Sequence, residues 1–422
     1  MTKSKNKKNY ISIIGLCYVG LPLAIEFGNY FNVIGFDIIK NRISQLNSHY
    51  DKNSQISKKG FNQSKLLKFS SDSNSISRSN IYIVTVPTPI LKNKKPDLRL
   101  IINSINLICE YISKNDLIIL ESTVYPGVTE DVCAKIIEKK TSYKLNKDFF
   151  MGYSTERINP GDNHHNLTNI IKLVSGSNKA TLNKVDKLYS KIIKAGTFKV
   201  DSIKIAESAK VIENIQRDVN IALMNEFSNI FKKMNLDNKK IFDAASTKWN
   251  FLNFTPGLVG GHCIGIDPYY LTYKAQSIGY TPNLILSARK INNQIPNEIY
   301  KDILKKIKKS KTKKKLSCLI LGISFKENCS DVRNSKIVDL YKLLITNNIN
   351  VKIYDPIADN TETNELYKIK LLNKLNGKYD IIIIGVAHKV FKKMGIKKIK
   401  NLLKHEGFIY DYKTIFNKET II

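Results

Sequence analysis

Short apolar runs alternate with longer, mixed stretches through the first half of the chain. Residues 11–14, 33–36, 81–86 and 117–120 form four such runs, and residues 149–151 and 170–174 continue the series. Continuous apolar runs of that length, separated by segments long enough for a helix, are typical of buried parallel strands. The pattern therefore predicts an α/β fold whose first sheet is Rossmann-like and doubly wound.

The periodicity changes in the middle of the chain. Residues 203–234 keep one helical period without Gly or Pro, and strand-like runs resume at residues 319–322, 351–354, 381–386 and 408–410. The change predicts a long central helix followed by a second, smaller Rossmann-like sheet. We therefore expect domains at residues 1–202, 203–302 and 316–422.

Composition and charge narrow the class of protein. Of the 422 residues, 42% are hydrophobic, which argues against a disordered or collagen-like chain. The net charge is +32, but the lysines are scattered, and the basic run at residues 304–315 lacks interleaved aromatic side chains. Solvated lysines explain this charge better than a nucleic-acid surface does, although a basic nucleic-acid-binding protein stays an alternative.

The cysteines and the amino-terminal segment indicate the cellular compartment in which the protein works. Six cysteines include no C-x-x-C pair and no zinc spacing with histidine, so we expect no metal and a reducing cytoplasm. Lysines precede an apolar stretch at residues 11–25, as in a secretory signal, but Gly15, Gly20 and Pro22 favour a strand, a turn and a helix. No other segment is long and apolar enough to predict a membrane span.

A glycine-rich turn predicts a dinucleotide site. Gly15-Leu-Cys17-Tyr-Val-Gly20 follows the first strand and opens a helix, where backbone N–H groups and the helix amino terminus can hold a pyrophosphate. Asp37 ends the second strand, where its carboxylate would accept from a ribose diol and repel a 2′-phosphate, so NAD is favoured over NADP. Cys17 replaces the glycine that lets the backbone approach the pyrophosphate, and we expect it to weaken NAD binding without abolishing it.

Four polar clusters suit a reaction at a nucleotide-linked carbon. Residues 121–127 and residues 153–161 each follow a strand, at the edge where open α/β sheets bind ligands. Lys210 and Asn214 share one face of the long helix and could stabilise an oxyanion. The glycine-rich loop of residues 257–268 carries the thiol of Cys263. The adjacent His262 is not expected to form a dyad with that thiol, because neighbours in sequence rarely meet in that way.

Together these motifs resemble the UDP-glucose/GDP-mannose dehydrogenase family, and the resemblance covers nearly all of residues 10–416. It rests on the first fingerprint, the central helix and the cysteine loop, and on Val-Pro-Thr-Pro at 86–89, Gly-x-x-Phe-Lys at 322–326, Asp-x-Arg-x-Ser at 331–335 and Tyr-Asp-Pro at 354–356. Residues 248–271 are similar to the branch that acts on UDP-N-acetylhexosamines, as in Vi-antigen and O-antigen synthesis. Ile266 stands where UDP-glucose enzymes carry a lysine, which argues against UDP-glucose.

The resemblance implies a four-electron oxidation of the C6 alcohol to a carboxylate, using two NAD and one water. UDP-N-acetylglucosamine would become UDP-N-acetylglucosaminuronate through a thiohemiacetal and then a thioester on Cys263. Lys210 and Asn214 would stabilise the oxyanions. Asp267 and Thr123 would handle a water in proton transfer, and Glu156 would assist thioester hydrolysis.

The resemblance also implies binding residues, domain roles and assembly. The first domain would bind NAD, the central one would dimerise and carry the cysteine loop, and the last would bind the UDP-sugar. We expect a cytoplasmic homodimer, or a higher homo-oligomer, that serves surface polysaccharide synthesis. The cofactor would contact Gly15, Cys17, Tyr18, Val19, Gly20, Asp37, Arg42, Thr88, Thr123 and Lys326. The substrate would contact Arg157, Lys210, Asn214, Phe254, Gly257, Gly260, Phe325, Lys326 and Arg333.

Several alternatives stay open at this point. UDP-N-acetylgalactosamine, UDP-N-acetylmannosamine and UDP-glucose fit the same chemistry, because no motif reads the direction of one substituent. A β-hydroxyacid dehydrogenase would share the first domain but would not need the thiol loop or the last domain. A non-catalytic relative is supported only by Cys17. Thr155 replaces the family's usual proline before Glu156, and we expect it to loosen that turn slightly.

Overall fold

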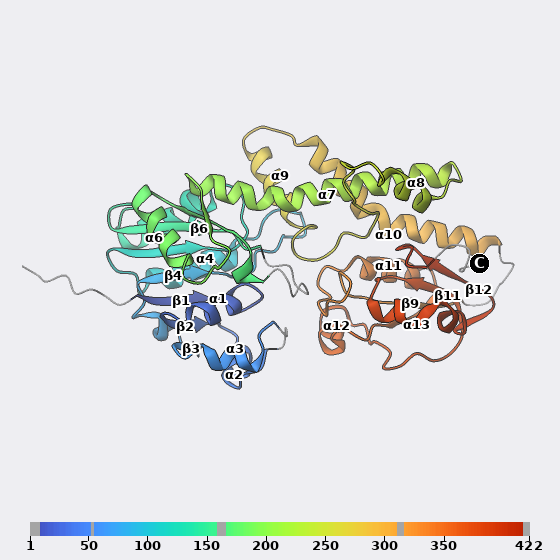
Figure 1. Ribbon diagram of the computed structural model, residues 1–422, viewed down its shortest axis with the longest axis horizontal. Coiled ribbons are helices and arrows are strands. Elements are labelled where there is room, and N and C mark those ends of the chain that lie inside the picture. The colour runs from blue at the N-terminus through green and yellow to red at the C-terminus, as the bar shows by residue number, and fades with distance from the viewer. Residues whose placement is uncertain (1–8, 52–54, 158–165, 310–315, 417–422) are drawn as a thin grey trace, which may run out of the picture. The chain divides into compact units, whose positions relative to one another are not determined.

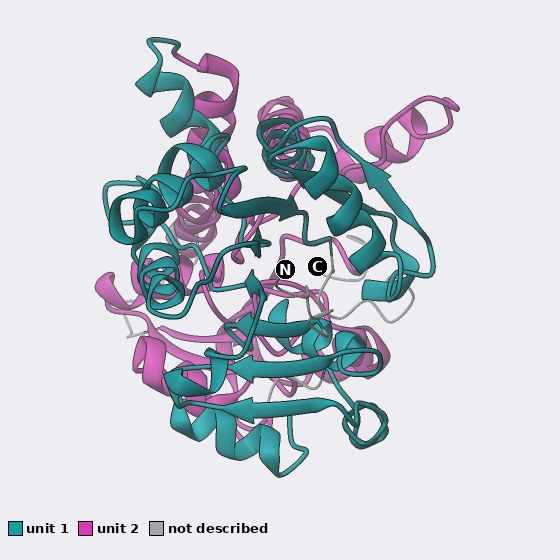
Figure 2. Cartoon of the chain, turned by 90° about the vertical axis from the view of Figure 1, so that its left-hand side faces the viewer, with its two compact units in different colours: residues 1–213, 269–280 teal, residues 214–268, 281–422 magenta. Residues whose placement is uncertain are grey.

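The computed structural model describes residues 9–51, 55–157, 166–309 and 316–416, and the chain divides into two compact units (Figures 1 and 2). Unit 1 comprises residues 1–213 and 269–280, and unit 2 comprises residues 214–268 and 281–422. Within the described residues, no helix combines the length and the apolar character that crossing a bilayer requires.

Unit 1 is built on an eight-stranded sheet with the order β3-β2-β1-β4-β5-β6-β7-β8. The first six strands run parallel, and β1 lies between β2 and β4. This is the doubly wound order expected from the sequence, with its switch point between β1 and β4. The strands are β1 (Tyr10–Ile14), β2 (Asn32–Phe36), β3 (Leu67–Ser70), β4 (Ile81–Val84), β5 (Asp116–Leu120), β6 (Phe149–Ser154), β7 (Lys172–Gly176) and β8 (Thr197–Lys199).

The two faces of this sheet are covered by different helices. Ile11 and Ile13 of β1 pack with α1 and α6 in one buried cluster, whereas Ile14 packs with α4 and α5 in another. Successive strand residues point to opposite faces, so a continuous apolar run buries both. The helices of unit 1 are α1 (Gly20–Phe27), α2 (Lys40–Asn47), α3 (Lys58–Gln63), η1 (Ser73–Ile76), α4 (Arg99–Cys109), the π-helical η2 (Val128–Ala134), α5 (Lys135–Thr141), η3 (Leu167–Asn169) and α6 (Lys179–Tyr189).

One strand differs from the sequence expectation. The apolar run at residues 170–174 was expected to form another parallel strand, but β7 pairs antiparallel with β6. A parallel return needs a crossover that spans the sheet, and the described residues between β6 and β7 contain only the short η3. The chain therefore turns back, and β8 then pairs parallel with β7 after the crossover through α6.

The long helical period forms α7 (Ile203–Lys233), which agrees closely with the predicted residues 203–234. The division between the units falls within this helix, after Glu213, and a second division falls near the start of α9 (Asp267–Ser277). Unit 2 further contains α8 (Asn238–Ala245) and α10 (Asn283–Lys309).

Unit 2 carries the second sheet, which is four-stranded and wholly parallel with the order β10-β9-β11-β12. Helices α10 and α11 pack on one face of this sheet, and α13 packs on the other. The sequence predicted β9, β10 and β11 within two residues at each end, whereas β12 begins five residues before the predicted run 408–410. The elements are β9 (Ser317–Leu321), α11 (Lys336–Thr346), β10 (Asn350–Tyr354), α12 (Asn360–Tyr367), β11 (Tyr379–Ile384), α13 (Lys389–Lys400) and β12 (Leu403–Asp411).

Candidate active site

The glycine-rich turn after β1 has the geometry of a pyrophosphate cradle. Gly15 adopts a φ of 96°, which favours glycine. A Cβ on Gly20 would lie 1.8 Å from the Gly15 carbonyl oxygen, so only glycine fits where α1 begins. The turn delivers the chain into the amino terminus of α1, whose first N–H groups favour an anion. The residues at this turn therefore fit NAD.

Asp37 and Arg42 hold this turn from the second strand. The buried Asp37 carboxylate accepts the Leu16 N–H at 2.9 Å and the Ile39 N–H at 3.0 Å. Arg42 donates from Nε to the Leu16 carbonyl at 3.1 Å and pairs with Asp51 at 2.9 Å. Each carboxylate oxygen of Asp37 keeps capacity for a further donor, as a ribose diol requires. Both residues thus orient the loop that carries Cys17, which is itself half-buried.

The loops that follow β4 and β5 are tied together. Thr88 donates its hydroxyl to the Thr123 carbonyl at 2.7 Å, and the Tyr270 hydroxyl donates to the Thr88 carbonyl. Ser122 donates to the Val86 carbonyl at 2.7 Å. The structure therefore brings together Thr88 and Thr123, two of the residues expected to bind the cofactor.

Glu207 of α7 anchors the next stretch of the same loop. Its carboxylate accepts the N–H of Gly127 at 2.5 Å, and the N–H and hydroxyl of Thr129 at 2.9 and 2.6 Å. Burial raises the pKa of Glu207 to about 7, although these three hydrogen bonds favour the charged form. Sequence reasoning missed Glu207, and no motif marks it.

The loop after β6 carries Glu156 and Arg157, both half-buried. Arg157, which was expected to bind substrate, donates from Nη1 to the Ile171 carbonyl at 3.1 Å and pairs with Glu213 of α7 through Nη2. Of the residues 158–161 that completed this predicted cluster, none lies within the described part of the chain.

Lys210 and Asn214 lie one turn apart on α7, as their spacing predicted, and both are buried. The Asn214 amide donates to the Asp267 carboxylate at 2.6 Å. Asp267 is buried at the start of α9, and its own N–H donates to the Cys263 carbonyl at 2.8 Å. Cys263 is exposed. The structure therefore joins Asn214, Asp267 and the Cys263 backbone within unit 2.

The carboxamide of Asn225 clamps the start of the cysteine loop. Asn225 Oδ1 accepts the Gly257 N–H at 2.8 Å, and its Nδ2 donates to the Gly257 carbonyl at 3.0 Å. The same amide donates to Asn292 of α10 at 2.8 Å and accepts the Tyr412 hydroxyl at 3.0 Å. Asn225 is fully buried and makes four hydrogen bonds, so its orientation is fixed.

The cysteine loop also contacts the segment that follows β9. His262 Nε2 lies 2.8 Å from Asp331 Oδ2, and Arg333 donates to both oxygens of that buried carboxylate at 3.0 and 2.7 Å. Burial alone would raise the pKa of Asp331, but hydrogen bonds from His262 and Arg333 hold the pKa well below its ordinary value. The Phe325 ring packs on Gly261, where a Cβ would come within 2.7 Å of it. His262 therefore faces a carboxylate.

A similar arrangement orders the turn after β9. The Asp355 carboxylate, at the end of β10, accepts the N–H groups of Ile323 and Ser324 at 2.8 and 3.2 Å. His388 is fully buried and lies 3.1 Å from the same oxygen. Burial would raise the pKa of Asp355, yet these partners lower it to about 2. This carboxylate thus fixes the loop that carries Phe325 and Lys326.

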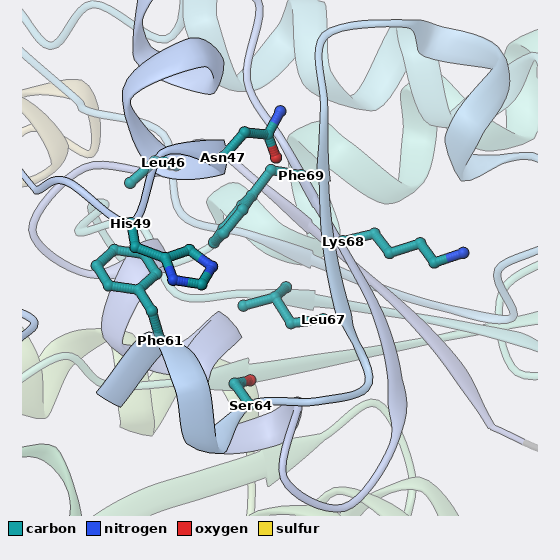
Figure 3. A pocket seen from close by; sticks show the side chains of 8 residues that line it. All are labelled: Leu46, Asn47, His49, Phe61, Ser64, Leu67, Lys68 and Phe69. Atoms are coloured by element: carbon teal, nitrogen blue, oxygen red, sulfur yellow. The ribbon is translucent and has the colours of Figure 1, made fainter. Parts of the chain in front are cut away.

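A separate pocket lies beside the first residues of β3 (Figure 3). It has a volume of about 350 Å³, and the His49 ring stacks on Phe61 at its wall. None of the candidate site residues lines it. Its lining residues are Leu46, Asn47, His49, Phe61, Ser64, Leu67, Lys68 and Phe69.

Three family models match consecutive parts of the chain. Residues 9–193 match the NAD binding domain of the UDP-glucose/GDP-mannose dehydrogenase family, residues 204–294 its central domain, and residues 319–418 its UDP binding domain. These matches account for most of the chain. The cofactor is therefore NAD, and the geometry of the first turn fits it.

Named relatives match the chain over almost its full length. The UDP-N-acetyl-D-glucosamine 6-dehydrogenases of Salmonella typhi and Pseudomonas aeruginosa are 46% and 45% identical, and each alignment covers 97% of both chains. The solved structure of a UDP-D-ManNAc dehydrogenase from Pyrococcus horikoshii superposes with a TM-score of 0.87 at 29% identity, covering 97% of this chain and 96% of that one. Sequence, site and fold thus agree: this chain is an NAD-dependent UDP-sugar dehydrogenase and belongs to the UDP-glucose/GDP-mannose dehydrogenase family.

Proposed function

We propose that the chain oxidises UDP-N-acetylglucosamine at C6 to UDP-N-acetylglucosaminuronate. The observation that carries this proposal is the loop of residues 257–266, which presents the exposed Cys263 thiol and leads into Asp267, held by Asn214 at 2.6 Å. The choice of sugar is supported by the names of the two relatives at 45–46% identity.

The chemistry divides between the cofactor and the protein. NAD, when bound, supplies the hydride acceptor, and the turn at Gly15 and Gly20 together with Asp37 would hold it. Cys263 Sγ would add to the C6 aldehyde carbon, with the thiol proton passing to the carbonyl oxygen, to give a thiohemiacetal. Loss of a hydride and the hydroxyl proton then gives a thioester, which water hydrolyses.

Polar side chains, three of them buried, would stabilise the charges that develop at C6. Lys210 and the Asn214 amide are donors for the developing oxyanions. Asp267 and Thr123 would position a water and move its proton, and Glu156 would act as the base in thioester hydrolysis. This chain keeps each of the catalytic residue types that its resemblance to the family implies.

The segment that follows β9 would bind the UDP portion of the substrate. Arg333 is fixed by Asp331, and Phe325 by Gly261, so both side chains are pre-oriented. Guanidinium and ammonium groups are the donors that a diphosphate needs, and we propose Arg333 and Lys326 for that role. Phe254, Gly257 and Gly260 would line the sugar.

We further propose that residues 1–202 form the NAD-binding domain and residues 316–422 the UDP-sugar-binding domain. The central residues 203–302 would form the interface of a homodimer. One face of α7 exposes Ile205, Ile212, Leu223 and Ile230, each more than 40% exposed and spaced by whole numbers of helical turns. An apolar stripe of this kind marks an interaction surface. Light scattering coupled to size-exclusion chromatography would measure the mass, and a monomer at micromolar concentration would contradict the dimer.

The product would be used to build a surface polysaccharide, and we propose that the enzyme works in the cytoplasm.

The test of the catalytic proposal is the amount of NADH released per UDP-N-acetylglucosamine consumed, with the N-acetylgalactosamine, N-acetylmannosamine and glucose analogues run in parallel. We expect two NADH per sugar consumed, and we expect the highest kcat/KM with UDP-N-acetylglucosamine. Activity only on another sugar would reject the substrate, and one NADH per sugar would reject the thioester route.

A further inference from the structure

A charged cluster lies buried inside unit 1, beneath two of the loops that carry candidate catalytic residues. Lys172, the first residue of β7, donates from Nζ to Glu121 Oε2 at 2.8 Å. Tyr189 of α6 donates its hydroxyl to the other oxygen of Glu121, and the Lys172 ammonium lies 5.3 Å from the centre of the Tyr189 ring. Lys172 is 4% exposed, Glu121 1% and Tyr189 0%.

Stability alone does not account for this cluster. Removing two charges from water costs several kcal/mol per ion, and well-packed apolar side chains of similar volume are commonly as stable as a buried ion pair. Burial and the neighbouring Glu121 raise the pKa of Tyr189 well above its ordinary value, so its hydroxyl remains a donor. The cluster is therefore held in one hydrogen-bonded arrangement.

The cluster reaches the backbone of the loop that carries Glu156. Lys172 Nζ donates to the Thr155 carbonyl at 3.0 Å, and the Thr155 N–H donates to the Leu173 carbonyl at 3.4 Å. Thr155 is fully buried, and no ring fixes its φ as a proline ring would, so its backbone is held by these hydrogen bonds. The ammonium thus fixes the direction of the peptide group that leads into Glu156.

The other end of the cluster belongs to the loop that carries Thr123. Glu121 follows β5 directly and stands two residues before Thr123, and the Glu121 and Ser122 N–H groups both donate to the Val84 carbonyl. Lys172 therefore links the ends of β5 and β6, through its ion pair with Glu121 and its hydrogen bond to the Thr155 carbonyl. Thr123 and Glu156 lie in the loops that follow these two strands.

We propose that Lys172, oriented by Glu121 and Tyr189, is a positioning residue for Glu156 in hydrolysis of the Cys263 thioester. The inference rests on the proposed function. In the step concerned, the oxygen of water bonds to the thioester carbon and the carbon–sulfur bond breaks. One water proton passes through the Glu156 carboxylate to the departing sulfur, and the other leaves when the product acid ionises.

A misplaced base should slow this step selectively. Displacement of a catalytic group by about 1 Å costs on the order of a hundredfold in rate. Because the oxidation steps precede hydrolysis, a variant at Lys172 should still form the thioester and then stall. The covalent adduct on Cys263 should accumulate, which a merely structural defect would not produce.

The experiment compares Lys172→Met with wild-type enzyme in stopped-flow mixing with saturating NAD and UDP-N-acetylglucosamine. We expect a burst of two NADH per subunit and an adduct on Cys263 by intact-protein mass spectrometry. The steady-state kcat should fall about a hundredfold and KM should fall with it, because slowing a step after the covalent intermediate lowers both and leaves kcat/KM unchanged. Lys172→Arg should retain most of the turnover. Lys199→Met, an exposed lysine of β8 paired with Asp186, is the matched control and should behave as wild type.

Lys172→Met leaves the charged Glu121 buried beside Tyr189, which disfavours folding, so the pair is also removed together in Glu121→Gln/Lys172→Met. Accumulated adduct in either folded variant supports the inference. Normal kcat, or lost turnover without burst and adduct, overturns it. Wild-type enzyme that releases two NADH per sugar upholds the proposed function whichever way the variants behave.

Discussion

The Asn225 clamp gives the sharpest test of how the cysteine loop is held. Asn225→Leu keeps the size of the side chain and removes all four of its hydrogen bonds. The Gly257 N–H, the Gly257 carbonyl and the Asn292 amide oxygen lie buried and would each lose a partner. A buried polar group without a partner costs about 1–3 kcal/mol, so the substitution should cost at least about 3 kcal/mol.

The cost should appear in the melting of unit 2. For a unit of roughly 200 residues, 1 kcal/mol corresponds to about 2–4 °C in Tm, so differential scanning calorimetry should record a fall of about 6–12 °C. We also expect kcat to fall at least about tenfold, because Gly257 begins the loop that positions Cys263. Both changes should occur together.

The matched control is Asn220→Leu on the same helix. Asn220 donates only to the Gln216 carbonyl among the bonds resolved for its side chain, and it is more exposed. Its replacement should change stability by less than about 0.5 kcal/mol. If Asn225→Leu lowers the Tm no more than Asn220→Leu does, the clamp does not hold the loop and the reasoning is refuted.

Three further predictions concern the turn that follows β1 and the turn that follows β9. Gly20→Ala places a Cβ 1.8 Å from the Gly15 carbonyl oxygen and should weaken NAD binding at least about tenfold by calorimetric titration, whereas Gly60→Ala in α3 should leave it unchanged. Cys17→Gly should tighten NAD binding by about threefold to tenfold, and an unchanged affinity would show that the Cys17 side chain turns aside. Because the folded-state pKa of Asp355 is lowered to about 2, its carboxylate stabilises the fold by about 2 kcal/mol above pH 4, and this is lost as the pH falls from 4 to 2. Urea unfolding across that range should show the loss in wild type and a flatter profile in Asp355→Asn.

The sequence predicted the elements whose apolar runs are long and buried on both faces. It missed β3 and β8, because Leu67–Ser70 and Thr197–Lys199 are short, half-exposed edge strands with little apolar signal. It also predicted the wrong direction for β7, because an apolar run carries no record of which way the chain enters the sheet. That direction depends on the connection before the strand.

The candidate site divides in the same way. Gly20 and Asp37 lie where their spacing predicted, because each depends on neighbours close in sequence or on a strand end. The hydrogen bond between Asn214 and Asp267 joins residues 53 apart, and the sequence did not predict it. Asn225 and Lys172 were missed because their partners are 32 to 187 and 17 to 51 residues away. One signal was available for Lys172, which interrupts the apolar run at residues 170–174. A lysine inside a buried strand requires an acidic partner.

The reversal of β7 has a consequence for how such a sheet can carry a cation. In an all-parallel sheet, a strand begins at the edge opposite the ligands, and its first residue is far from the chemistry. Because β7 runs against β6, its pairing places Lys172 two steps past Ser154, beside the end of β6 rather than its start. An inserted strand of either polarity could complete the hydrogen-bonded ladder, but only the reversed one delivers its opening residue to the functional edge. The reversed direction of β7 is therefore enough to bring Lys172 to the functional edge, without an additional loop.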